Sequence, residues 1–315
     1  MSRIEVKRDA EEIDLPALKE LLSAAGEADA HPALGEHAWL DLVQGGREGF
    51  AGLVAWEDGH PHPVGYAQVS LGPQDYHGAS GRLSWALEVV VDPHHRVPGN
   101  TVAQELVRSA IDLIAREGGG HLHLWVNQPH PFHDRMAAEA GLKPGRALYQ
   151  MRRRLPLAEH ATVAVRPFEL GRDETAWLEL NNSAFAWHPE QGGWTADTLK
   201  SRQVQPWFNP ADFLLLEEEG ALIGFCWTKI HPGPAPVGEI YVVAVAQVAS
   251  GRGLGRQMVL AGLDHIASKG ITEAMLYVDA DNYKAVKLYV DLGFTVNHID
   301  RAYTGDIAPA SPGPN

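Results

Sequence analysis

The chain has 315 residues, a hydrophobic fraction of 45% and a formal net charge of −14. This length allows two domains of ordinary size, and the acidic balance argues against a nucleic-acid partner because phosphate binding needs a basic face. The sequence has no apolar run near the roughly 18–20 residues that span a bilayer, no signal-peptide pattern at its start and one cysteine, Cys226. We therefore expect a cytoplasmic protein without a membrane partner or an internal disulfide.

The first half of the chain predicts alternating strands and helices. An apolar, β-branched run predicts a strand, and the following segment has apolar residues at the spacing of a helix. In chain order, we expect a strand over residues 87–93, a turn over 96–101 and a helix over 102–115. A strand over 121–126, a short helix over 131–140 and a strand over 147–155 follow. A turn-prone segment follows, so we place the boundary of the first domain after residue 158.

The second half predicts a longer series of the same kind. It begins with a strand over residues 163–167 and two helices over 174–185 and 196–202. Two strands over 213–217 and 221–230 then form a hairpin. It continues with a strand over residues 238–245, a glycine-rich turn over 250–255 and a helix over 257–263. A strand over 276–282 and a helix over 285–292 complete it. We assign this domain to residues 159–304 and expect the Pro- and Gly-rich tail, residues 305–315, to be disordered.

The two halves resemble each other, which predicts a tandem duplication. Each half contains a strand, a turn and an amphipathic helix, and the two turns begin at Arg96 and Ser250. Aligning the copies places Trp85 opposite Glu239 and Ala137 opposite Tyr289. The first domain therefore lacks the groups that could act as base and acid in the second, and we expect it to be a degenerate copy.

The turn in the second domain predicts a site for a diphosphate. Glycines at positions 251, 253 and 255 let the backbone bend tightly and bring several N–H groups to the start of a helix. The turn lacks the Gly-Lys-Ser/Thr ending of a P-loop, and no Gly-x-Gly-x-x-Gly with a distant acidic residue is present. Nucleotide and dinucleotide sites of those kinds are therefore not favoured.

The spacing Ser250-x-x-Gly253-x-Gly255 resembles the pyrophosphate loop of the GNAT superfamily of N-acetyltransferases, and segments 276–282 and 285–294 resemble the second half of that fold. Segments 180–195, 227–232 and 238–242 further resemble the mycothiol synthase family, whose members have tandem GNAT domains. The resemblance covers nearly the whole chain. It implies a mixed α+β fold, in which each domain has a largely antiparallel sheet flanked by helices, and acetyl-CoA-dependent acetylation of the cysteinyl amine of cysteinyl-glucosaminyl-inositol.

Two residues are candidates for acid–base chemistry. Glu239 lies four residues before Val243 on one strand, so alternation would place both side chains on one face of the sheet. Glu239 is the candidate general base, and the resemblance makes Tyr289 the acid that protonates the CoA sulfur. An ordinary ion pair and a packed aromatic are the alternative interpretations of these two residues.

The resemblance also implies two sets of binding residues. In the second domain, acetyl-CoA would be held by Val243, Ala244, Val245, Ser250, Gly251, Arg252, Gly253, Leu254, Gly255 and Arg256, with help from Asn282 and Lys287. The pseudodisaccharide would contact Glu36, Glu190, Lys229, Glu239 and Tyr277. A second, non-reacting acetyl-CoA would lie in the first domain against Val89, Val90, Val91, Arg96 and Gly99.

Three positions depart from the family pattern. Ser250 and Gly251 stand where basic residues are common, and Thr101 stands where Gly or Ala is usual. Losing the two basic side chains would weaken contacts to the pyrophosphate while leaving the backbone N–H groups in place. Thr101 casts similar doubt on acetyl-CoA binding in the first domain.

Other chemistries are less favoured. Cys226 lies in a hydrophobic strand, which predicts a buried structural thiol. The pairs His121/His123 and His130/His133 come without a zinc-binding motif, so we expect no metal. Two other functions stay open beside the mycothiol reaction: acetylation of aminoglycosides or peptide N-termini, and a non-catalytic acetyl-CoA sensor. We expect a monomer that acts on a small-molecule amine.

Overall fold

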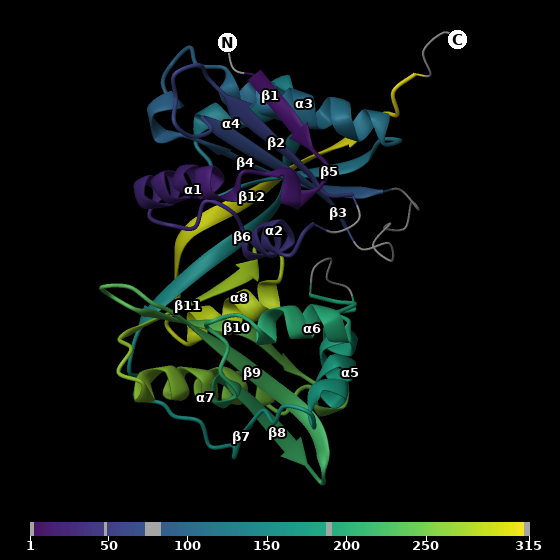
Figure 1. Ribbon diagram of the computed structural model, residues 1–315. Coiled ribbons are helices and arrows are strands. Elements are labelled where there is room, and N and C mark those ends of the chain that lie inside the picture. Colours follow the sequence, from purple (N-terminus) through teal and green to yellow (C-terminus); the bar gives the residue numbers. More distant parts are fainter. Residues whose placement is uncertain (1–2, 47–48, 73–82, 187–190, 312–315) are drawn as a thin grey trace. The chain divides into compact units, whose positions relative to one another are not determined.

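The computed structural model describes residues 3–46, 49–72, 83–186 and 191–311. The chain divides into two units, which we call unit 1 (Met1–Ala147 with Asp300–Asn315) and unit 2 (Leu148–Ile299). Each contains a mixed, largely antiparallel sheet with helices packed on both faces (Figure 1). The predicted fold class is therefore confirmed.

Unit 1 is built around a sheet in the order β1-β2-β3-β4-β5-β12, in which only β4 and β5 run parallel. Its strands are β1 (Arg3–Lys7), β2 (Ala51–Trp56), β3 (Gly65–Leu71), β4 (Ser84–Val91), β5 (Gly120–Val126) and the end of β12 (Thr295–Ile307). Its helices are η1 (Ala10–Glu12), α1 (Leu15–Asp29), α2 (Glu36–Val43), η4 (Pro93–His95), α3 (Val102–Arg116) and α4 (Pro131–Glu139).

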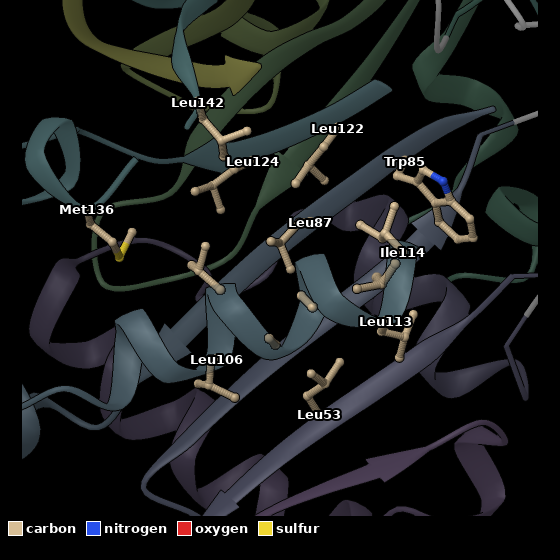
Figure 2. Packing of buried hydrophobic residues seen from close by; sticks show 14 of the residues in the cluster. Leu53, Trp85, Leu87, Leu106, Leu113, Ile114, Leu122, Leu124, Met136 and Leu142 are labelled. Atoms are coloured by element: carbon tan, nitrogen blue, oxygen red, sulfur yellow. The ribbon is translucent and has the colours of Figure 1, made fainter. Parts of the chain in front are cut away.

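Two hydrophobic clusters hold unit 1 together, one on each face of its sheet. Figure 2 shows the first, in which Leu106, Leu113 and Ile114 of α3 pack against leucines of the strands. Helices α1 and α2 supply the second, where Leu18 and Leu21 are fully buried. The apolar residues of α3 recur at helical spacing, so one stripe of the helix is buried as the sequence predicts.

Unit 2 has a sheet in the order β6-β11-β10-β9-β8-β7, in which only β10 and β11 run parallel. Its strands are β6 (Lys143–Arg154, from Leu148 onward), β7 (Arg166–Pro167), β8 (Phe213–Glu218), β9 (Ala221–His231), β10 (Val237–Val245) and β11 (Glu273–Asp279). Its helices are α5 (Glu174–Ala184), α6 (Ala196–Gln203), η5 (Pro210–Asp212), η6 (Gln247–Ala249), α7 (Leu254–Ser268) and α8 (Tyr283–Asp291).

The two faces of the unit 2 sheet have different cores. On one, which we call the α7 face, Cys226 and Ile240 pack under α7 and α8. On the other, the α5 face, Trp227 and Val242 pack with Trp177 in an aromatic cluster under α5 and α6. Glycine permits the close approach of α7, because a Cβ at Gly262 would lie 2.5 Å from the Cys226 sulfur.

The predicted boundary after residue 158 does not coincide with the division between the two units, which falls after Ala147 and again before Asp300. Residues Leu148–Arg154 of β6 pair with β11 in unit 2, and Arg301–Ile307 of β12 pair with β5 in unit 1. Each unit therefore takes its last strand from the other half of the sequence. The predicted disordered tail is wrong at its start, because residues 305–307 are hydrogen-bonded in β12. Local sequence pattern predicts a strand but does not specify which edge it joins.

The helices of the described residues are also too short or too polar to serve as membrane spans.

Candidate active site

Strands β10 and β11 separate at the centre of unit 2. Their parallel register runs from Gly238↔Ala274 to Ile240↔Leu276 and ends there, although β10 continues to Val245 and β11 to Asp279. Beyond Ile240, β10 remains paired only with β9. The edge of β10 that faces β11 thus leaves backbone groups available between the two strands, including those of the predicted Val243–Val245 segment.

A β-bulge lies at the point of separation. Ile240 pairs with Thr228 and Val242 with Trp227, so Tyr241 is the extra residue of β10. The bulge reverses the alternation: Val243 packs on the α7 face, whereas Glu239 pairs with Lys229 on the α5 face. The expectation that Glu239 and Val243 share a face is therefore wrong, because it assumed an unbroken strand.

Glu239 is a nearly buried carboxylate with a close histidine partner. The residue is 7% exposed, and its Oε2 lies 2.6 Å from Nε2 of His231. The pairs Val237↔His231 and Glu239↔Lys229 make Glu239 and His231 diagonal neighbours across antiparallel strands. A carboxylate held in this way accepts a proton in a defined direction, which is what a general base requires.

Two further predicted substrate residues lie on the same face as Glu239. The ammonium of Lys229 lies 4.3 Å from the ring centre of Trp207 and 5.2 Å from that of Tyr241. Tyr277 lies two residues after Met275, which pairs with Glu239, so its side chain is also on the α5 face. The face thus carries a carboxylate, an ammonium and a phenol beside the point where the strands separate.

The Tyr277 hydroxyl is oriented from β6. Gln150 Nε2 donates a hydrogen bond to it at 2.8 Å, while Gln150 Oε1 accepts from Arg152 Nε at 2.9 Å. Gln150 is itself buried. Tyr277 is 40% exposed, so its ring remains accessible to a ligand.

Tyr289 lies on the opposite face of the sheet from Glu239. It is 7% exposed within the core under α7 and α8, and its ring centre is 5.9 Å from that of Phe294. Burial raises the pKa of its hydroxyl above the usual range, so the group stays protonated and is able to donate a hydrogen bond. The gap between β10 and β11 thus has Glu239 on one face of the sheet and Tyr289 on the other.

The turn before α7 has the backbone geometry of an anion site. Gly253 is the N-cap residue of α7 and has a φ of +76°. As a glycine, it has no side chain that could bond the first N–H groups of the helix. A Cβ at Gly251, Gly253 or Gly255 would meet nothing within 4 Å, so the space in front of the turn is open. The first N–H groups of α7 have no intrahelical acceptor and face this space with the positive end of the helix dipole.

The charged residues around this turn are paired in the structure. Arg252 forms two hydrogen bonds with Glu218, at 2.6 and 2.7 Å, and Arg256 Nε donates to Glu159 at 2.9 Å. A surface cavity lies beside Arg256 and Glu159. A bound diphosphate would compete with these carboxylates for the two arginines, whereas the backbone N–H groups need no rearrangement.

The two residues at α8 that are predicted to contact acetyl-CoA bond to neighbouring residues of the same helix. Asn282 follows β11 and caps α8, accepting a hydrogen bond from Ala285 N at 3.2 Å. Lys287 pairs with Asp291 at 2.9 Å one turn further along the helix. The expectation that the strand extends to Asn282 is wrong, because β11 ends at Asp279 and Asn282 begins a helix.

Among the described residues of unit 1, the positions aligned with Glu239 and Tyr289 carry no acid or base. Its β4 and β5 also separate, after Glu88↔Trp125, but β4 pairs with β3 without a bulge. Trp85 is buried and donates its ring N–H to Gly119 O at 3.0 Å. Ala137, aligned with Tyr289, is fully buried.

The corresponding turn of unit 1 is also less open. Arg96 lies against the end of the Val89–Val91 segment, donating Nε to Val91 O at 2.8 Å and pairing with Asp29. Gly99 keeps a positive φ of 89°. The first helical N–H, that of Val102, is already bonded to Asn100 Oδ1 at 3.0 Å. One donor that is available in unit 2 is therefore used internally in unit 1.

The remaining predicted residues are distributed elsewhere. Glu36 begins α2 in unit 1, and Glu190 lies outside the described residues. Cys226 is fully buried and burial raises the pKa of its thiol, which confirms a structural cysteine. His121 pairs with Asp306 at 2.8 Å, and the ring of His133 accepts from His130 N at 3.0 Å.

His231 and Gln150 are functional candidates that sequence reasoning missed. His231 lies two residues after Lys229 on the same strand, so alternation alone could have placed it on the face of Lys229. Gln150 had no such signal, because β6 reaches β11 from the other half of the sequence.

The sequence is similar to those of known acetyltransferases. The sequence matches the acetyltransferase (GNAT) family over residues 15–141 and 176–294, one match in each half. It is 42% identical to the mycothiol acetyltransferase of Thermobispora bispora over 299 residues, covering 92% of this chain and 95% of that one. It is 39% identical to the mycothiol acetyltransferase of Acidimicrobium ferrooxidans over 298 residues, covering 91% and 92%.

A solved structure shares the fold. A GCN5-related N-acetyltransferase from Sphaerobacter thermophilus superposes with a TM-score of 0.67 at 23% sequence identity, covering 98% of this chain and 97% of that one. At this identity, the match concerns the fold alone.

Proposed function

The chain belongs to the GNAT acetyltransferase family and, within it, to the mycothiol acetyltransferases, and from this we propose that unit 2 acetylates the cysteinyl amine of cysteinyl-glucosaminyl-inositol with acetyl-CoA. The chain is an acyltransferase. The observation that carries the finer proposal is the buried Glu239 carboxylate beside the separation of β10 and β11.

The first step is deprotonation of the amine by Glu239. A cysteinyl α-amine has an ordinary pKa of about 7.7–8.0, well below the roughly 10.4 of lysine, so a single carboxylate suffices near neutral pH. The proton moves from the ammonium to a Glu239 oxygen, directly or through one water. The freed nitrogen lone pair then attacks the thioester carbon to give a tetrahedral intermediate. As the C–S bond breaks, the nitrogen loses its second proton and the departing thiolate takes up one proton from Tyr289, whose hydroxyl regains a proton from solvent.

The thioester would lie in the gap between β10 and β11. A backbone N–H of the Val243–Val245 segment on the open edge of β10 is the donor that would stabilise the oxyanion. Tyr289, on the opposite face from Glu239, would donate to the departing sulfur. The amine would thus approach the carbonyl carbon from the face of Glu239, and the thiolate would leave toward the face of Tyr289, which keeps base and acid apart.

The turn over 250–256 would bind the diphosphate of acetyl-CoA. Its contribution comes from backbone N–H groups and the helix dipole, so the absence of basic side chains at Ser250 and Gly251 does not remove it. Lys229 and Tyr277 would bind hydroxyl groups of the acceptor on the α5 face. We include Glu36 and Glu190 as further acceptor contacts by resemblance to the family.

A panel of acceptors tests the substrate. Purified full-length protein is given acetyl-CoA with cysteinyl-glucosaminyl-inositol, an aminoglycoside or a short peptide, and CoA release is followed by chromatography. We expect the first acceptor to have the highest kcat/KM. A preference for the aminoglycoside or the peptide would contradict the assignment while retaining the acetyltransferase, and tight acetyl-CoA binding without turnover of any amine would favour a sensor.

His231 is expected to be a positioning residue for Glu239. Replacing it with alanine removes the contact at 2.6 Å, and we expect kcat to fall by about tenfold with little change in KM for acetyl-CoA. His231→Gln keeps an N–H donor and should recover part of the rate. The separate effects on kcat and KM distinguish this role from a structural one: kcat should fall in the alanine variant while KM for acetyl-CoA holds. Failure of His231→Gln to recover any of the rate would contradict the role.

The glycine turn makes a prediction about acetyl-CoA affinity. Alanine at Gly253 must adopt φ near +76°, which costs about 1–2 kcal/mol and pushes a Cβ toward the diphosphate, so KM for acetyl-CoA should rise by about tenfold. Gly270→Ala is the matched control, because Gly270 also has a positive φ of 78° and an open surrounding but follows the far end of α7. Equal effects of the two variants on KM would show that strain alone is responsible and would contradict the binding role.

A further inference from the structure

A cluster of histidines and carboxylates lies in unit 1, apart from the residues of the proposed reaction. Glu57 and His60 lie in the loop between β2 and β3, and His95 lies in the turn between β4 and α3. One ligand atom from each of the three falls within 4.8 Å of the other two. His60 and His95 are 35 positions apart along the chain, so the fold brings them together.

His95 is held between two carboxylates. Its Nε2 lies 3.1 Å from Glu57 Oε2, and its Nδ1 lies 3.4 Å from Asp92 Oδ1. A neutral imidazole has a single N–H, so it can donate to only one of these oxygens and must turn a nitrogen lone pair toward the other. A cation between His95 and Glu57 resolves this conflict.

The distances within the cluster suit a small divalent ion. Zinc binds imidazole nitrogen and carboxylate oxygen at about 2.0–2.2 Å, which places neighbouring ligand atoms of a tetrahedral site about 3.3–3.6 Å apart. The Glu57 Oε2 atom lies 3.1 Å from His95 Nε2 and 3.8 Å from His60 Nε2. Small movements of the half-buried Glu57 and exposed His60 side chains would therefore complete a three-ligand site with one position open to water.

The surroundings supply the outer groups that such a site needs. Asp92 is buried and also accepts from His94 N at 2.8 Å, so its carboxylate is fixed. A hydrogen bond from His95 Nδ1–H to Asp92 leaves Nε2 as the metal ligand, which is the usual carboxylate–histidine–metal arrangement. The His95 side chain is 9% exposed and that of His60 is 38% exposed, so one ligand is held rigidly and another is accessible.

We propose that Glu57, His60 and His95 form a binding site for a divalent transition-metal ion of the Zn²⁺ class. Imidazole and carboxylate ligands favour Zn²⁺ over Mg²⁺ and Ca²⁺, which prefer oxygen ligands alone. The ion cross-links the β2–β3 loop to the turn that precedes Arg96. It therefore fixes the turn of unit 1 that corresponds to the acetyl-CoA turn of unit 2.

Metal stoichiometry tests the proposal directly. Full-length protein without a polyhistidine tag is stripped with a chelator, dialysed against Zn²⁺ and analysed for bound metal; we expect about one Zn²⁺ per chain. Co²⁺ in place of Zn²⁺ should give the visible absorption of a four-coordinate site. Because neither readout depends on acetyl transfer, failure here would leave the proposed function untouched.

Variants locate the site. His60→Ala and Glu57→Gln each remove one ligand at an exposed or half-buried position, and we expect Zn²⁺ affinity to fall by at least about tenfold in each. His121→Ala is the control, since His121 also pairs with a carboxylate but lies on β5. No bound metal in the wild type, or binding that survives in both variants, would overturn the proposal.

Discussion

Replacing Glu239 with glutamine is expected to lower kcat for acetyl transfer by about 10²- to 10⁴-fold, the usual contribution of a general base. Glutamine has nearly the same shape and can still contact His231, so the fold and the binding of acetyl-CoA should be preserved. Because the base acts in the transition state, kcat and kcat/KM should fall together. Steady-state kinetics with the cysteinyl acceptor measures both.

Glu217→Gln is the matched control for this variant. Glu217 lies on β8 of the same sheet and pairs with Arg166, outside the proposed reaction site. It should retain nearly the wild-type rate. A Glu239→Gln enzyme with kcat within about fivefold of wild type would exclude Glu239 as the base, because a lost base has a larger effect.

Replacing Tyr289 with phenylalanine is expected to lower kcat by about 10²-fold, since the departing thiolate loses its hydrogen-bond donor. The ring packing against Phe294 is retained, so stability should change little. Burial raises the pKa of this hydroxyl, and the wild-type rate should therefore show no loss from tyrosine ionisation between about pH 8 and about pH 10. A pH–rate profile of the wild type and the variant checks both points.

Tyr283→Phe removes a hydroxyl from the same helix and controls for the loss of Tyr289. Tyr283 is 78% exposed at the start of α8, so its variant should match the wild type. If Tyr289→Phe also keeps nearly full activity, the thiolate leaves without help from Tyr289, and the acid must be water or another group.

Much of the fold could be predicted because its signals are local. Helices α3 and α7 have apolar residues at helical spacing, and β10 is a segment rich in β-branched residues before a glycine turn. The exchange of β6 and β12 between the units could not be predicted, because pairing joins strands that are far apart in sequence. A strand pattern contains no information about its partner.

The geometry of the candidate site could be predicted only in part. Glu239, Lys229 and Tyr277 do share a face, but the bulge at Tyr241 turns Val243 to the other one. A bulge adds one residue without a clear sequence signal, so counting by twos fails beyond it. Whether the residues assigned to acetyl-CoA and acceptor bind them stays a prediction.

The histidine cluster of unit 1 shows the same limit. Sequence spacing drew attention to His121/His123 and His130/His133, which form ordinary local contacts. The cluster of Glu57, His60 and His95 arises because two loops meet at one end of the sheet, and no short motif marks it. Ligands contributed by separate loops are found from the folded structure.

The central claim is that unit 2 transfers an acetyl group to the cysteinyl amine with Glu239 as the base. Mass spectrometry of the product formed from acetyl-CoA and cysteinyl-glucosaminyl-inositol, by wild type and by Glu239→Gln in parallel, tests it most directly. We expect the wild type to place one acetyl group on the amine nitrogen and the variant to form almost none in the same time. Acetylation elsewhere on the acceptor, or equal product from both proteins, would contradict the account.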